Sequence, residues 1–167
     1  SLSNDKGTNR FRWNMRHSGS WDKDPKKAFL NGPLVAPGTY VAQINIEGKI
    51  YTDKFKILLD PNVEKSGIRI RNVKAQEKLA LQVRSLLDES KIMAHKLKDV
   101  EDGPMLVIKK ALITNEGPYP QPMLIDQARY LGSMLDRSDQ QPGDDAYSRF
   151  EELNEQFESL KKSFSHL

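Results

Sequence analysis

The chain has 167 residues, a formal net charge of +3 and no cysteine, which excludes disulfides, thiolate metal sites and a cysteine nucleophile. Basic and acidic residues are mixed along the chain, so a nucleic-acid partner is not predicted. No apolar run reaches the roughly 18 residues of a membrane helix, so no membrane span is predicted either. No signal peptide is visible, and the abrupt opening leads us to expect a piece of a longer protein, with any targeting segment upstream.

Residues 8–16 are predicted to form a strand with one buried face. Phe11, Trp13 and Met15 alternate with Arg10, Arg12, Asn14 and Arg16, and a period of two is typical of a half-buried strand. Residues 17–37 are rich in Gly, Pro, Ser and Asp and are predicted to be a loop, with a short strand allowed at 28–30.

Residues 36–61 predict a β-hairpin that turns at Gly48. The residues expected on its apolar face are Tyr40, Ala42, Ile44, Ile46, Tyr51, Phe55, Ile57 and Leu59, with Asp53 as an exception. A lone hairpin is marginal in water, and three or four strands do not close a sandwich. The face therefore needs a cover, either the helices of this chain or upstream strands, and we favour upstream strands.

The pattern changes to helical spacing after about residue 72. Three apolar stripes follow: Leu79, Val83, Leu86, Met93, Leu97 and Val100; Leu124, Ala128, Leu131 and Leu135; and Phe150, Leu153, Phe157, Leu160 and Phe164. Residues 105–113 fit a strand, a short helix or an apolar strap. The predicted fold is α+β, with an Ig-like or fibronectin-like antiparallel β region over 1–66 and an antiparallel three-helix bundle over 67–167.

Two segments resemble the region after the propeller in bacterial sortilin-like, BNR-repeat β-propeller proteins, often labelled glycosyl hydrolases. They are "GTNRFRWNMRH" and "GPLVAPGTYVAQINIEGKIYTDKFKILLDPNV", and the helical tail is also similar. The positions that match are Gly7, Asn9, Arg10, Trp13, Asn14, Met15, Arg16, Gly32, Pro33, Pro37, Gly38, Tyr40, Gly48, Asp60 and Pro61. The resemblance implies an Ig-like or FlgD-like β-domain with a helical tail, downstream of a propeller, in a secreted or periplasmic protein.

No catalytic, cofactor-binding or metal-binding residues are predicted. The adjacent acids at 22/24, 144/145 and 151/152 do not face each other across a substrate, as a glycosidase requires. His17, His95 and His166 lack metal-ligand spacing, and the "HSGSW" segment lacks the features of a nucleophile elbow.

Together with this resemblance, the sequence predicts a non-catalytic accessory and interaction region of a larger exported β-propeller protein, which acts as a spacer or docking surface. Candidate residues for contact with a glycan or another protein are Trp21, Tyr119, Arg10, Arg12 and Arg16. Two alternatives stay open: a carbohydrate-binding module that uses Trp21, and a part of a glycoside hydrolase site completed by upstream residues.

Overall fold

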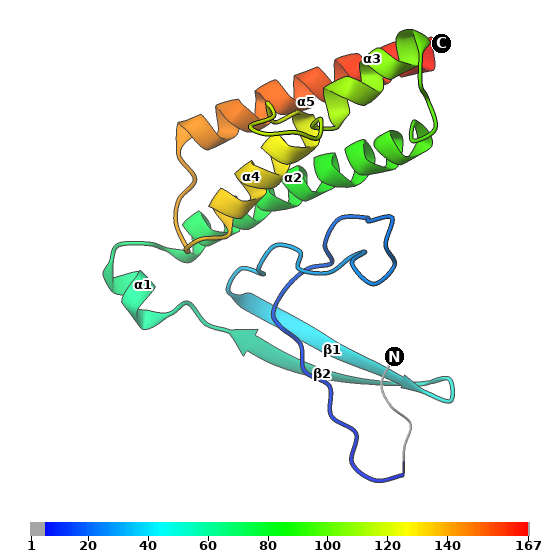
Figure 1. Ribbon diagram of the computed structural model, residues 1–167. Helices are drawn as coiled ribbons and strands as arrows, with labels where there is room; N and C mark the ends of the chain where they lie inside the picture. The colour runs from blue at the N-terminus through cyan, green and yellow to red at the C-terminus, as the bar shows by residue number, and fades with distance from the viewer. Residues whose placement is uncertain (1–5, 167) are drawn as a thin grey trace.

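A computed structural model describes residues 6–166 as an α+β chain of two strands and five helices. The elements are β1 (Gly38–Ile46), β2 (Lys49–Ile57), α1 (Pro61–Lys65), α2 (Ile70–Lys96), α3 (Gly103–Leu112), α4 (Leu124–Leu135) and α5 (Asp144–Ser165). Figure 1 shows α2 to α5 grouped together, while the hairpin of β1 and β2 stands apart from them. Residues 16–36, called the docked loop below, lie between the hairpin and α2.

The predicted hairpin is confirmed, together with its apolar face. The strands are antiparallel, with Tyr40 opposite Phe55 and Ile44 opposite Tyr51, so these side chains project from the same side. Glu47 and Gly48 form a two-residue turn with φ of 51° and 83°, the backbone that joins twisted strands most easily. The side chain of Asn45 accepts a 3.0 Å hydrogen bond from the Gly48 N–H and stabilises the turn.

The strand predicted over residues 8–16 is absent from the described structure. The segment has no ladder partner, and Met15 adopts a φ of 57°, which ends any extended run there. Its last residues pair instead with the end of the docked loop, because the Val35 N–H donates to the Met15 carbonyl at 3.0 Å. The short strand allowed at 28–30 is also absent, since this part of the loop forms a turn in which Phe29 has a φ of 61°.

All three predicted apolar stripes lie in the helical core. The innermost side chains are Leu79 and Val83 of α2, Leu124 and Ala128 of α4, and Leu153 and Phe157 of α5. Residues 103–112 form the helix α3, which buries Ile108 and Leu112 in the same core. The helical region therefore contains four helices around one core rather than the predicted three.

Gln76 of α2 joins the start of that helix to the end of α4. It is buried, and its side-chain N–H groups donate to the carbonyl oxygens of Leu135 and Ser138, while its Oε1 accepts from the Gln140 N–H. Further along, Lys161 of α5 binds Glu89 of α2 at 3.0 Å. These contacts make α4 antiparallel to α2, and α5 parallel to it (Figure 1).

Candidate functional site

The outer half of the hairpin face is bare. Ile44, Ile46 and Tyr51 keep 44%, 56% and 50% of their surface exposed. Within residues 6–166, no Cα atom of a helix lies within 8 Å of a Cα atom in either strand. The described helices therefore do not cover the face. Lys49 and Asp53 lie among its apolar residues, with the Lys49 Nζ 5.6 Å from the centre of the Tyr51 ring. Exposed apolar side chains gathered on one face and bordered by charged residues are typical of an interaction surface.

The inner half of the hairpin face is partly covered by an aromatic cluster. The Trp13 ring lies 5.7 Å from the ring of Tyr40 and 6.0 Å from that of Phe55. Trp13 Nε1 donates to the Arg16 carbonyl at 3.0 Å, and the Tyr40 hydroxyl donates to the Ala36 carbonyl at 2.6 Å. Burial raises the pKa of Tyr40, and the nearby Glu77 carboxylate adds to the shift. The cluster therefore fixes the hairpin against the docked loop.

Three acidic side chains of the helical region hold the docked loop. Glu77 of α2 accepts hydrogen bonds from His17 Nε2 at 2.8 Å and from the Ala36 N–H at 3.0 Å. Asp136, at the end of α4, forms a two-point ion pair with Arg16 at 2.9 and 3.0 Å. Farther along α2, Asp88 accepts from the backbone N–H of Trp21. Charge-assisted bonds at both ends of the loop hold it in place.

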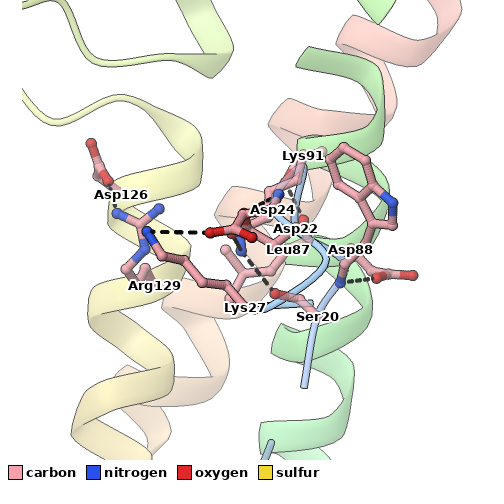
Figure 2. A network of polar contacts seen from close by, with 11 residues as sticks. Ser20, Asp22, Asp24, Lys27, Leu87, Asp88, Lys91, Asp126 and Arg129 are labelled. Atoms are coloured by element: carbon pink, nitrogen blue, oxygen red, sulfur yellow. Dashed lines mark hydrogen bonds and ion pairs between the residues drawn. The ribbon is translucent and has the colours of Figure 1, made fainter. Parts of the chain in front are cut away.

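Lys91 of α2 binds the loop between these acidic anchors (Figure 2). Its Nζ lies 3.1 Å from Ser20 Oγ and 3.4 Å from the Asp22 carboxylate. A serine beside a lysine also occurs in hydrolases that use a neutral lysine as the base. Here Lys91 also contacts the Asp22 carboxylate, so the serine and the lysine belong to the network of contacts that anchors the loop.

The Asp22 contact makes the stability of the docked loop depend on pH. A hydrogen bond from the Asp24 N–H, followed by the contact with Lys91, lowers the pKa of Asp22 below its ordinary value of 3.8. A carboxylate whose folded-state pKa is lowered stabilises the fold above its ordinary pKa, and this contribution is lost as the pH falls through the folded-state value.

We expect Asp22→Asn to lower the free energy of unfolding at neutral pH, and the difference from the unmodified chain to shrink below a pH of about 3.8. Urea titrations over this range measure the effect. The exposed Asp99→Asn is the matched control and should leave the curve unchanged. A constant difference between Asp22→Asn and the unmodified chain at all pH values would contradict the assignment.

A pocket of about 540 Å³ lies between the docked loop, α2 and the end of α4. Its apolar lining includes Leu30 and Leu34 of the loop and Val73, Val83 and Leu87 of α2. Its cationic lining residues are Arg16, Arg84, Lys91, Arg129 and Arg137, and its acidic ones are Glu77, Asp136 and Asp139. The volume lies within the usual range for small-molecule sites.

The structure separates the predicted contact residues. Trp21 is half-buried, with its ring 5.2 Å from the His95 ring, so it packs on α2. Arg16 is half-buried at the pocket, whereas Arg10 and Arg12 are exposed on the segment that forms no strand. Tyr119 is fully exposed on the loop between α3 and α4. These residues therefore do not form one continuous surface, and Trp21 offers only part of its ring for stacking.

Apart from Arg16, the residues that shape the pocket were not predicted from the sequence. Glu77, Ala80, Arg84, Leu87 and Lys91 recur at intervals of three or four, which places them on one side of α2. This second stripe has charged residues at its ends and middle, so an apolar pattern does not reveal it. The polar Gln76, which lies between the apolar positions 73 and 79, was a visible signal of a buried polar contact.

Comparisons of the chain with protein-family models, with curated proteins and with solved structures found no match. The resemblance to sortilin-like propeller proteins therefore stays a prediction based on motifs. Within residues 6–166, no group of three or more His, Asp or Glu side chains is arranged to hold a metal ion. None of the helices described is both long and apolar enough to cross a membrane.

Proposed function

We propose that this chain is a non-catalytic interaction region whose hairpin face docks against further β-strands of the same protein. The observation that carries the proposal is the bare outer half of the face, formed by Ile44, Ile46 and Tyr51. A two-stranded sheet is marginal without a cover, and the helices of this chain bury their apolar stripes in a core of their own.

The chemistry of the hairpin favours a sheet as the partner. Its two faces differ, because the aromatic side chains Tyr40, Tyr51 and Phe55 all lie on the apolar face. The opposite face is mostly polar, with Val41 and Ile50 as its apolar members; it holds Thr39, Val41, Gln43, Asn45, Ile50, Thr52, Lys54 and Lys56. Each strand has only one pairing neighbour in the described structure, so one edge of each remains open to another strand. Added strands would complete an Ig-like sandwich with the apolar face inside, and the motif resemblance suggests an exported protein with an upstream propeller as their source.

The proposal predicts site-specific crosslinking in the full-length protein as the cell produces it. A photoreactive p-benzoylphenylalanine in place of Tyr51 should crosslink to a segment of the same polypeptide outside residues 6–166, because Tyr51 lies on the bare face. The same probe at Lys54, on the opposite face, is the matched control and should give little product. Mass spectrometry of the crosslinked peptides identifies the partner.

Two results would overturn the proposal. Equal crosslinking from positions 51 and 54 would show that the apolar face has no preferred partner. Crosslinks that join residue 51 to a second copy of residues 6–166 would replace docking within the chain by self-association. Ile44→Asp gives an independent check, since it should abolish the crosslink from position 51 while the helical core, which Ile44 does not touch, keeps its unfolding midpoint.

A further inference from the structure

We propose that the pocket under the docked loop binds a small organic acid with an apolar body, and that Arg84 of α2 anchors the acid group. The inference is independent of the docking proposed for the hairpin face. It rests on the volume of the pocket, on its mixed lining, and on the Arg84 Nε, which has no hydrogen-bond partner within residues 6–166.

Arg84 is the unusual residue of the pocket. Its Nε is buried and is the one buried side-chain nitrogen or oxygen within residues 6–166 that has no hydrogen-bond partner. Buried polar groups are nearly always hydrogen-bonded, so an orphan donor needs an explanation. Among the described residues, no hydrogen bond or ion pair fixes the Arg84 guanidinium. It lines the pocket and can therefore turn toward an anion there.

Three of the other four cations of the pocket are paired with acids, and the fourth, Arg137, is exposed. Arg16 is paired with Asp136, Lys91 with Asp22, and Arg129 with Asp126. Figure 2 shows Lys91 and Arg129 with these acidic neighbours. Arg84 therefore carries a positive charge that the protein does not neutralise at close range, within a pocket whose charged lining residues are mostly basic.

The lining also indicates what kind of anion fits. Leu30, Leu34, Val83 and Leu87 contribute apolar surface beside Arg84, so an apolar body can be buried while the acid group reaches the guanidinium. A volume of about 540 Å³ exceeds the needs of an inorganic anion. The concave shape and the acidic residues at the pocket, Asp136 and Asp139, disfavour a nucleic-acid backbone.

Octanoate is a suitable probe, with octanol and octylamine as neutral and cationic analogues of similar length. We expect octanoate to cause saturable NMR shifts of the amides of Gly19, Gly32 and Gly132, which line the pocket, and of the Arg84 Nε–H itself. The amide of Gly48, in the hairpin turn, should not shift. A shift there would indicate that the probe binds the exposed hairpin face instead of the pocket. Octanol and octylamine should bind at least about tenfold more weakly, because they lack a charge-assisted bond to Arg84.

Arg84→Gln should weaken octanoate binding by about tenfold or more and leave octanol binding unchanged. The exposed Arg71→Gln on the same helix is the matched control. Equal binding of the three probes, shifts at Gly48 without shifts at the pocket glycines, or full octanoate affinity in a folded Arg84→Gln would each overturn the proposal. If that variant does not fold, the Arg84 Nε–H signal of the unmodified chain still decides the question. A saturable shift of this signal with octanoate supports the proposal, and the absence of a shift overturns it.

Discussion

Phe157→Ala should lower the free energy of unfolding by about 3–5 kcal/mol, the usual range for loss of a fully buried phenylalanine. Phe157 of α5 is 2% exposed in the core shared by α2, α3, α4 and α5. Its removal leaves a cavity between helices that are already close-packed. Small domains have a total stability of about 5–15 kcal/mol, so this loss is a large share of the total.

Urea denaturation followed by far-UV circular dichroism measures this loss. Phe11→Ala is the matched control, because Phe11 is 71% exposed, and it should change the free energy of unfolding by less than about 0.5 kcal/mol. Similar losses in the two variants would contradict the placement of the core among the four helices.

Gly19→Ala should displace the docked loop from α2. Gly19 is buried, and a Cβ atom there would overlap the carbonyl group of Leu30. Two backbone hydrogen bonds hold the two arms of the docked loop together at this point. They run from the Gly19 N–H to the Phe29 carbonyl at 2.8 Å and from the Phe29 N–H to the Ser20 carbonyl at 3.0 Å. We expect a cost above the roughly 1–3 kcal/mol of ordinary overpacking, because backbone rather than a flexible side chain must move.

Hydrogen exchange of the peptide that covers residues 17–35 reports the displacement. The Trp21 N–H, which donates to Asp88, should lose its protection, and the pocket should lose its affinity for octanoate. Gly132→Ala is the control on the opposite wall of the pocket, where a Cβ would meet only Val83 at an ordinary contact distance of 3.5 Å. Unchanged exchange in Gly19→Ala would show that the loop does not depend on this close approach.

The wrong prediction over residues 8–16 shows where pattern reasoning stops. Trp13 and Met15 have the alternation of a strand, but a strand also needs a neighbour to accept its backbone hydrogen bonds. Trp13 instead packs its ring on Tyr40 and Phe55. The same uncertainty applied to residues 105–113, whose apolar run was compatible with a helix and a strand, and which became helical in contact with the bundle.

The amino-acid sequence by itself determined the elements whose signal is local. The alternation around Gly48 specified the hairpin and its apolar face, and the spacing of three and four residues specified the core stripes of α2, α4 and α5, because side-chain direction follows directly from these periods. Only the tertiary structure decided what those surfaces meet. It left the outer half of the hairpin face exposed, laid the loop on α2, and placed Arg84 in a pocket where its Nε has no partner among the described residues. These features depend on contacts between residues far apart in the chain, which no local period encodes.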